Sequence, residues 1–470
     1  MYELVIRSQA KQKTARFKVQ SSAGSQYWID CTARGQGRPK ISSRPLRFSP
    51  AIIVPMQEAV LEASSELLPA VDSRVPMSRR FTLAITILLG SFAGLGPLAI
   101  DMYLPSFPTI AREFGATISQ VERTLTAYLF GLALGQLFYG PASDRYGRKR
   151  PLYVGLVLFV FASAGCAFAT GVKSLLALRS LQAIGGCAEM VIARAVVRDL
   201  FHDRAAVRVF SSLMLVMGIA PILAPFLGGW VVAHMGWRTD FWLLVAAGSL
   251  CFCGAVFLLP ESLPPARRQT HSIAATLQLY RRLLTHRIFI VHTLTVSLAC
   301  AALFAYVGGS PGLFMEHYHI PPQRFWLFFG ANAFCLIMMS QVNSYLAHRM
   351  DPRKILRIAL AVSVIAATIL LLVVVKDWGG LWAVFSCLFV FLGTFGFIFP
   401  NTTVLAMSPH GANAGNASAL LGFFQFLISA IGGIIVTNLP FSAPTNMAVL
   451  IAGSMGLVPV IRLIGRINRG

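Results

Sequence analysis

Twelve apolar runs, each about 20 residues long, are the feature that most constrains the fold of this chain. A helix of that length crosses the hydrocarbon core of a bilayer, and lipid leaves no partner for backbone groups outside helices and barrels. Each run therefore predicts a membrane-spanning helix. To within a few residues, we expect these helices over 81–103, 122–140, 152–171, 174–195, 209–232, 240–260, 287–309, 324–347, 355–375, 380–400, 414–437 and 443–463.

The composition agrees with an integral membrane protein. Hydrophobic residues make up 56% of the 470 positions and charged residues 12%, whereas soluble domains carry roughly 25% charged residues. The net charge of +22 does not indicate a nucleic-acid partner, because ten of the forty basic residues lie in the first fifty positions and most others lie in alternate loops. That distribution is typical of membrane topology, so the expected partner is the lipid bilayer.

Loop charges predict the orientation of the helices. If the first helix starts in the cytoplasm, the cytoplasmic connections and the C-terminus hold nineteen basic residues and the external connections hold six. Cytoplasmic loops of membrane proteins are enriched in Lys and Arg. We therefore expect both termini in the cytoplasm.

The longest internal connection divides the chain into two sets of six helices. We expect a six-helix bundle over 77–260, a cytoplasmic linker over 261–286 and a second bundle over 287–470, related by a pseudo-twofold axis. A weak internal repeat, Ser344-Tyr-Leu-Ala-His-Arg-Met-Asp-Pro-Arg-Lys354, echoes the loop described next. Residues 1–76 are expected to be a disordered basic tail; a natural start at Met77 and a transit peptide are the alternatives.

One loop has a distinctive spacing of glycines and charges. Residues 140–150 read Gly-x-x-x-Asp-Arg-x-Gly-Arg-Lys-Arg, a tight basic turn between two predicted spans. It resembles the loop between the second and third helices of major facilitator superfamily transporters. The resemblance implies an all-α fold of twelve transmembrane helices and a gating role for Gly140, Asp144, Arg145, Gly147, Arg148 and Lys149. We expect Asp144 and Arg145 to form a cytoplasmic latch that holds the outward-open state.

Further motifs resemble the Bcr/CflA subfamily of drug:proton antiporters. They are Ile-Asp-Met-Tyr-Leu-Pro at 100–105, Gly-Gln-Leu-Phe-Tyr-Gly-Pro at 135–141, Ala-Tyr-Val-Gly-Gly-Ser-Pro at 305–311 and Gly-Asn-Ala-Ser-Ala-Leu-Leu-Gly at 415–422. The resemblance implies a monomeric, cofactor-free efflux protein of the bacterial inner membrane, driven by the proton gradient. Bicyclomycin, chloramphenicol-type compounds and sulfonamides are substrate classes of this subfamily.

Ionisable residues inside the predicted spans are candidates for proton coupling, because a charge at mid-bilayer costs about 2.5–3.5 kcal/mol on insertion scales. We identify Asp101, Arg179, Glu189 and Arg194 in the spans, and the first three are the candidates for proton coupling. Asp101 is our candidate proton carrier, since movement between an apolar and a watery cavity would switch its protonation; capping of the helix end is the alternative. Arg179 resembles the arginine of the family's fourth-helix motif and could supply a cation to Asp101.

Glu189 leaves several roles open. It could be a second titrating site, a contact for cationic drugs or a partner for Arg194, which we place at the inner end of its helix. The polar candidates for contacts to substrate, for each of which a helix–helix hydrogen bond is an equal alternative, are Tyr103, Tyr128, Gln136, Gln182, Tyr306 and Asn332.

The fifth span carries Pro221, Pro225, Gly228 and Gly229 in the segment Ala-Pro-Ile-Leu-Ala-Pro-Phe-Leu-Gly-Gly-Trp. It resembles the antiporter motif of the superfamily, and we expect it to seal or pivot the two halves. Prolines break backbone hydrogen bonds and glycines permit close packing of helices.

Other functions fit the sequence less well. No nucleophile–base set, phosphate-binding loop or metal-ligand cluster occurs, so we expect neither an enzyme nor an ATP-driven pump. A proton-coupled uptake symporter of the same fold remains an alternative, and a non-transporting membrane receptor is another.

Overall fold

The computed structural model describes residues 14–20, 26–32, 40–42, 79–201, 203–268 and 273–467. The chain divides into two compact units, Met1–Met77 and Ser78–Gly470, each of which is described by itself.

The first unit contains a small antiparallel sheet. Its strands are β1 (Thr14–Gln20), β2 (Gln26–Thr32) and β3 (Lys40–Ser42), in the order β1-β2-β3. The structure has strands at these three segments, where we expected a disordered tail, and the rest of residues 1–76 lies outside the described residues. The basic composition hid runs rich in β-branched and aromatic residues, such as Tyr-Trp-Ile at 27–29, which favour strands.

Twelve helices of 19 residues or more occur in the described part of the second unit. Each overlaps one predicted span. They are α2 (Arg79–Asp101), α4 (Ile118–Tyr146), α5 (Lys149–Ala167), α6 (Val172–Leu200), α7 (Asp203–His234), α8 (Arg238–Phe257), α10 (Arg287–Pro311), α11 (Pro322–Ala347), α12 (Pro352–Lys376), α13 (Gly380–Met407), α14 (Ala414–Asn438) and α15 (Ala443–Ile467).

Shorter elements join the long helices. The 3₁₀ turn η1 (Leu104–Ser106) and the helix α3 (Phe107–Glu113) follow α2, and the π-helical turn η3 (Gly312–His317) follows α10. The predicted linker between the halves contains a 3₁₀ turn, η2 (Pro265–Arg267), and a 13-residue helix, α9 (Ile273–Thr285). A last 3₁₀ element, η4 (Ser408–Asn413), separates α13 from α14.

Local sequence explains where several helices begin and end. A reciprocal capping box between Thr117 and Gln120 starts α4, and the Asp351 side chain accepts the Arg353 N–H at 2.7 Å to start α12. Gly147 ends α4 with φ of 90°, a backbone conformation that favours glycine. This turn places the basic loop between α4 and α5.

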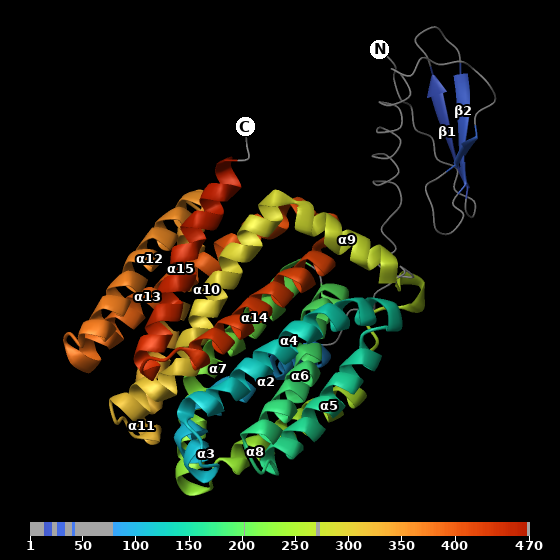
Figure 1. Ribbon diagram of the computed structural model, residues 1–470. Coiled ribbons are helices and arrows are strands. Elements are labelled where there is room, and N and C mark those ends of the chain that lie inside the picture. The colour runs from blue at the N-terminus through green and yellow to red at the C-terminus, as the bar shows by residue number, and fades with distance from the viewer. Residues whose placement is uncertain are drawn as a thin grey trace. The chain divides into compact units, whose positions relative to one another are not determined.

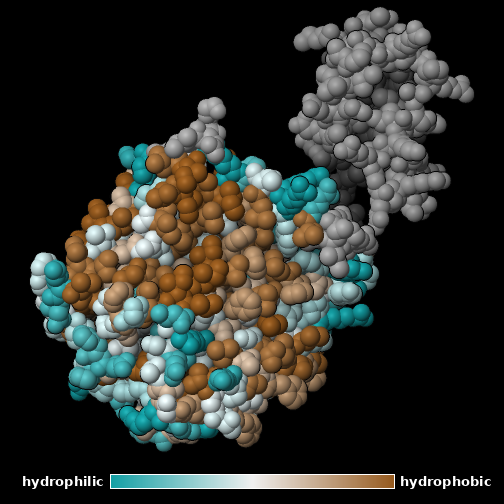
Figure 2. Space-filling model, viewed as in Figure 1, coloured by the Kyte–Doolittle hydropathy of each residue, from teal (hydrophilic) through white to brown (hydrophobic). Residues whose placement is uncertain are grey.

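The outer surface of the bundle suits a bilayer. Figure 2 shows hydrophobic side chains over much of its flank and hydrophilic ones toward its two ends. Phe257 is 82% exposed and Leu250 is 74% exposed, which would be unfavourable in water. Eleven helical segments in the described residues are long and apolar enough to cross a membrane. The remaining long helix, α4, carries more polar residues and packs between α6 and α14.

The twelve long helices form two halves with matching contacts (Figure 1). In the first half α5 packs against α6 and α8, and in the second half α12 packs against α13 and α15. The pairs α4–α6 and α11–α13 also correspond. These equivalent pairs confirm two six-helix halves related by a pseudo-twofold.

Two seams join the halves: the α4–α14 contact and the α7–α11 contact. The pseudo-twofold exchanges these seams with each other. We call the end of the bundle with the 140–150 loop the basic end and the opposite end, with α3, the far end (Figure 1). At the far end of the first seam, Arg123 donates to the Thr437 carbonyl at 3.3 Å and to Asn438 Oδ1 at 3.1 Å. At the far end of the second seam, a Cβ added at Gly229 would lie 2.6 Å from the Pro322 carbonyl oxygen.

Candidate functional site

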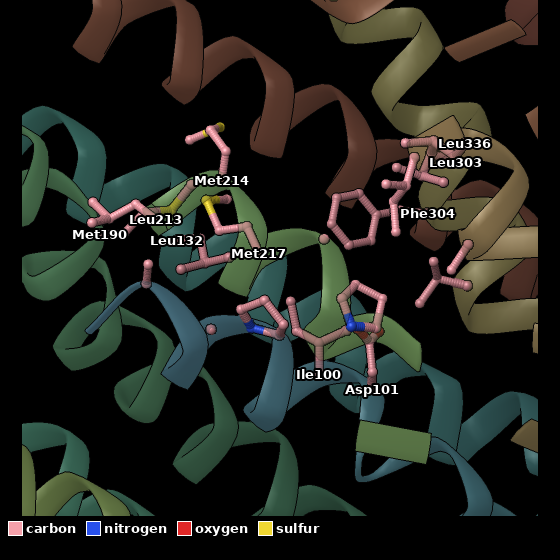
Figure 3. A pocket seen from close by; sticks show the side chains of 18 of the residues that line it. Ile100, Asp101, Leu132, Met190, Leu213, Met214, Met217, Leu303, Phe304 and Leu336 are labelled. Carbon is pink, nitrogen blue, oxygen red and sulfur yellow. The ribbon is translucent and has the colours of Figure 1, made fainter. Parts of the chain in front are cut away.

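A cavity of about 330 Å³ lies between the two halves, lined by α2, α4, α6 and α7 from one half and by α10, α11, α13 and α14 from the other. Its lining is mostly apolar. Figure 3 shows Met190, Met214 and Met217 on one side and Phe304 with Leu303 and Leu336 on another. This volume and lining suit a small drug-like molecule, since such sites typically measure about 300–1,000 Å³.

Asp101 is the acidic residue among the residues that line this cavity. It is the last residue of α2 and is 6% exposed. Within the described residues, its carboxylate forms no hydrogen bond or ion pair. Its side chain lies beside Ile100 at the edge of the cavity in Figure 3. The predicted proton carrier is therefore buried at the cavity and has no partner there.

Two of the six predicted substrate contacts line the cavity together. Asn332 Nδ2 of α11 donates to the Tyr306 hydroxyl of α10 at 3.0 Å, and Asn332 Oδ1 is buried without a partner. That oxygen could accept a hydrogen bond from a ligand. The other four candidates do not line the cavity: Tyr103, Tyr128, Gln136 and Gln182. Tyr103 and Gln182 form hydrogen bonds to Thr124 and Ser163 of neighbouring helices, whereas the Tyr128 hydroxyl is buried without a partner.

Arg179 occupies an aromatic cage inside the first half. Its guanidinium carbon lies 4.7 Å from the Tyr103 ring centroid, 4.3 Å from that of Tyr128 and 5.8 Å from that of Phe241. Arg179 Nη1 donates to Gln182 Oε1 at 2.6 Å, while Nε and Nη2 are buried without partners. Cation–π contacts therefore take the place of the ion pair with Asp101 that the sequence suggested.

Glu189 and Arg194 lie on different faces of α6. Glu189 is 1% exposed, both its oxygens are buried without partners, and it does not line the cavity. Arg194 does line the cavity. The two side chains form no ion pair in the structure, so one of the predicted alternatives for Glu189 is not observed.

Two buried carboxylates were missed from the sequence. Glu122 of α4 is 8% exposed, and its Oε1 would lie 2.8 Å from a Cβ added at Gly308. Asp240 of α8 is 1% exposed; its Oδ2 accepts the Ser106 hydroxyl at 2.6 Å and its Oδ1 has no partner. Both residues stand at the predicted edges of spans, where a charge is ordinarily expected in water.

The glycines of α7 lie at close approaches of the backbone. A Cβ added at Gly228 would overlap the Met102 carbonyl, and one added at Gly229 would meet Pro322 of α11 in the other half. Pro221 lines the cavity and Pro225 lies one turn further along α7. This helix therefore contacts the cavity and the seam between the halves at once.

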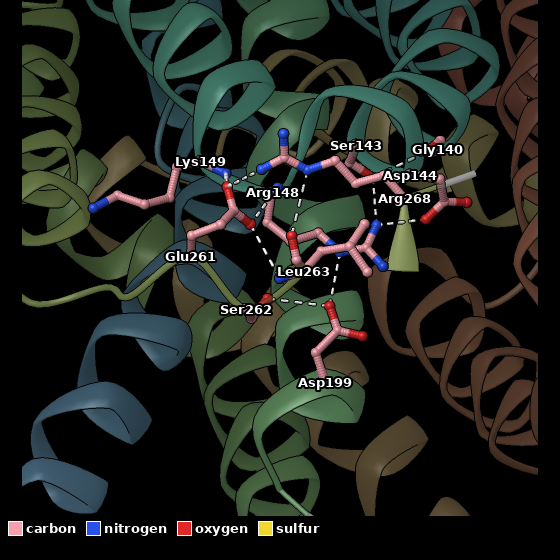
Figure 4. Close-up of polar contacts among 10 residues, drawn as sticks. All are labelled: Gly140, Ser143, Asp144, Arg148, Lys149, Asp199, Glu261, Ser262, Leu263 and Arg268. Carbon is pink, nitrogen blue, oxygen red and sulfur yellow. Dashed lines mark hydrogen bonds and ion pairs between the residues drawn. The ribbon is translucent and has the colours of Figure 1, made fainter. Parts of the chain in front are cut away.

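The basic loop is held by charged groups of its own half and of the linker (Figure 4). Arg148 pairs with Asp144 at 2.6 Å and with Asp199 of α6 at 2.8 Å. Glu261 accepts the Arg148 backbone N–H at 2.8 Å. Burial disfavours the charged Arg148 guanidinium, but Asp199 and Asp144 outweigh burial and raise the pKa of Arg148 above its ordinary value. Asp144 thus pairs with an arginine of its own loop.

Arg145, the other residue of the predicted latch, forms no ion pair among the described residues. Its guanidinium lies 5.5 Å from the Tyr146 ring centroid. Among the described residues, the ion pairs of the loop therefore join α4 to α6, a backbone hydrogen bond adds the linker, and none of these contacts reaches the second half.

The sequence profile described as Major Facilitator Superfamily matches residues 79–436. The chain belongs to the major facilitator superfamily. It is 38% identical over 351 residues to the uncharacterized transporter YdgK of Bacillus subtilis, covering 74% of this chain and 87% of the relative. It is 29% identical to a bicyclomycin resistance protein homolog of Haemophilus influenzae, covering 78% and 92% of the two chains. A chloramphenicol resistance protein of Pseudomonas aeruginosa is 30% identical, with 77% and 86% covered.

Solved structures agree on the fold. The xylose transporter XylE of E. coli, in a partially occluded inward-open conformation, matches this transporter with a TM-score of 0.64 at 12% identity, covering 82% of this chain and 98% of XylE. The predicted major facilitator fold is confirmed, and the named relatives confirm the resemblance to the bicyclomycin and chloramphenicol resistance group.

Proposed function

We propose that this transporter exports drugs or other small amphipathic compounds across the bacterial inner membrane in exchange for protons. The observation that carries the proposal is the unpaired Asp101 carboxylate at the edge of an apolar cavity between the halves. An ionisable residue buried in a membrane protein indicates a functional site. The relatives named as bicyclomycin and chloramphenicol resistance proteins support drugs as substrates.

Asp101 carries the proton in this scheme. When the cavity is closed and apolar, the neutral acid is favoured; when water enters from the opposite side, the proton leaves. Arg179 influences Asp101 only indirectly. Its guanidinium lies over the ring of Tyr103, two residues after Asp101. Glu189 stays a candidate for a second titrating site. Its position away from the cavity argues against direct contact with a drug.

The basic end faces the cytoplasm in this scheme, together with both termini, as the loop charges suggest. The two halves rock about the α4–α14 and α7–α11 seams, and Gly229 of α7 sets how closely the far end closes. The loop network of Arg148, Asp199 and Asp144 keeps the basic end of the first half rigid while it moves. Asp144 and Arg145 remain candidates for a latch to the second half in the outward-open state. The transporter works as a monomer without a cofactor.

The test is drug-driven proton movement in proteoliposomes containing the purified protein and a trapped pH-sensitive dye. We expect chloramphenicol gradients to move protons with the wild type and not with Asp101→Asn. Asp240→Asn is the matched control, because Asp240 is equally buried but does not line the cavity. Full drug-dependent proton flux in Asp101→Asn would refute the assignment of the carrier.

The direction of drug movement distinguishes export from uptake, and the absence of movement would indicate a receptor. Energised cells that express the transporter in a strain without its own drug pumps should accumulate less chloramphenicol than cells without it. Greater accumulation would indicate the uptake symporter. Binding without any movement of labelled drug in proteoliposomes would indicate the receptor.

A further inference from the structure

Arg194 brings a second charge to the cavity, at a place where the sequence did not predict one. The cavity face of α6 consists of Gly186, Met190, Ala193 and Arg194. Throughout the described residues, no hydrogen bond or ion pair involves the Arg194 guanidinium. This cation therefore lines an apolar cavity with no protein anion to balance it.

Asp101 does not supply that anion. It ends α2 at the far end of the bundle, whereas Arg194 lies six residues before the basic end of α6. At 1.5 Å per residue, Arg194 is about 9 Å from that end of its helix. The two charges thus mark opposite ends of the cavity and form no ion pair.

The lining of the cavity indicates which kind of ligand would bind to Arg194. Leu213, Met214 and Met217 of α7 and Leu336 and Ile337 of α11 line the same cavity with apolar surface. A guanidinium is planar and binds carboxylate or sulfonate groups through two parallel hydrogen bonds. An unpaired charge is unfavourable in apolar surroundings. An anionic ligand that pairs with Arg194 removes this cost, so its carboxylate or sulfonate should contribute most of the free energy of binding.

We propose that Arg194 is the anion-recognition residue of the cavity, and that the transporter accepts amphipathic organic acids whose single carboxylate or sulfonate binds Arg194 while the apolar body occupies the methionine-lined side. This inference rests on the proposed function and adds a substrate class to it. The methionines suit apolar bodies of varied shape, because their side chains are flexible and polarizable. Arg194 acts here on substrate choice, and Asp101 keeps the proton.

The assignment predicts how many charges cross the membrane in each transport cycle. Exchange of one proton for a neutral drug moves one charge across the membrane, and exchange of one proton for a monovalent organic anion moves two charges in the same direction. The membrane potential contributes about 2.3 kcal/mol per charge per 100 mV. Export of organic acids should therefore depend more steeply on membrane potential than export of chloramphenicol.

The test uses two probes with the same apolar body, labelled 2-naphthoate and 2-naphthamide, which differ only in the carboxylate. Affinities are measured by equilibrium dialysis with the purified full-length protein at pH 7.5. For the wild type we expect naphthoate to bind at least tenfold more tightly than naphthamide. Arg194→Gln should remove that preference, and Arg194→Lys should restore part of it. Arg198→Gln is the control, because Arg198 is exposed one turn further along α6 and outside the cavity lining.

The outcomes separate this inference from the proposed function. Chloramphenicol transport by the wild type, combined with equal affinity for the two probes, overturns the role of Arg194 and leaves drug export standing. A naphthoate preference that survives in Arg194→Gln has the same consequence. Absence of both chloramphenicol and naphthoate transport in proteoliposomes with an imposed proton gradient would overturn the proposed function itself. A monodisperse size-exclusion profile of each variant shows that it has folded.

Discussion

Gly229 offers a way to shift the transporter between its two states with a single methyl group. In the structure, a Cβ at this position would lie 2.6 Å from the Pro322 carbonyl oxygen of the other half, whereas ordinary contact begins near 3.4 Å. In Gly229→Ala the methyl group and the Pro322 carbonyl oxygen would therefore be about 0.8 Å closer than an ordinary contact. Overpacking of this kind costs about 1–3 kcal/mol.

This cost raises the free energy of only one state, the one in which the far end is closed. The Gly229–Pro322 contact joins the two halves, so it is lost when the far end opens. A cost of about 1–3 kcal/mol confined to the closed state shifts the equilibrium toward far-end opening by roughly 5- to 150-fold. Gly228→Ala is the matched control. Its methyl group would overlap Met102 of the same half, so the strain is present in both states and lowers stability without changing their ratio.

The assay measures distances between spin labels at the far end. Lys173→Cys and Lys376→Cys, in a background without native cysteines, place labels at exposed positions on opposite halves. We expect Gly229→Ala to increase the population with the longer distance, and Gly228→Ala to lower the melting temperature while leaving the distances unchanged. Equal shifts in both variants, or an unchanged distribution in well-folded Gly229→Ala, would contradict the argument.

Two further predictions concern polar groups. Arg148→Ala removes the partner of Asp144 and Asp199, and hydrogen bonds to charged groups contribute about 1.5–3 kcal/mol; the melting temperature should fall well below that of the control Arg145→Ala, and an equal fall in both would count against the network. Tyr306→Phe leaves the buried Asn332 amide without its acceptor, for a loss of about 1–3 kcal/mol. Adding Asn332→Leu should recover part of that loss in thermal unfolding, and strictly additive losses would show that the pair does not act as a unit.

The sequence predicted the helices well because length and hydropathy suffice to define a span. The 20-residue runs matched all twelve long helices. Errors occurred at the ends of the spans. The start of α4 lies four residues earlier than predicted, so Glu122, expected at the water-exposed edge of the span, is buried beside Gly308 of α10.

The residues that line the cavity were harder to predict. The spans are apolar on every side, so helical periodicity does not distinguish the face toward the cavity from the face toward lipid. Tyr306 and Asn332 proved to line the cavity, whereas Tyr128 and Gln182 face the interior of one half. The cage around Arg179 combines rings from α4, α8 and the turn after α2, and a single sequence gives no sign of that meeting.

The far ends of the two seams are equivalent by symmetry but differ in chemistry. Arg123 closes one of them with charged hydrogen bonds to the end of α14, and Gly229 closes the other by backbone contact with Pro322. Salt ions screen the attraction between the Arg123 charge and the amide oxygens of Thr437 and Asn438, and they leave steric packing almost unaffected. A rise in ionic strength should therefore weaken the α4–α14 contact at the far end before the α7–α11 contact, so that the two seams separate in that order when the far end opens.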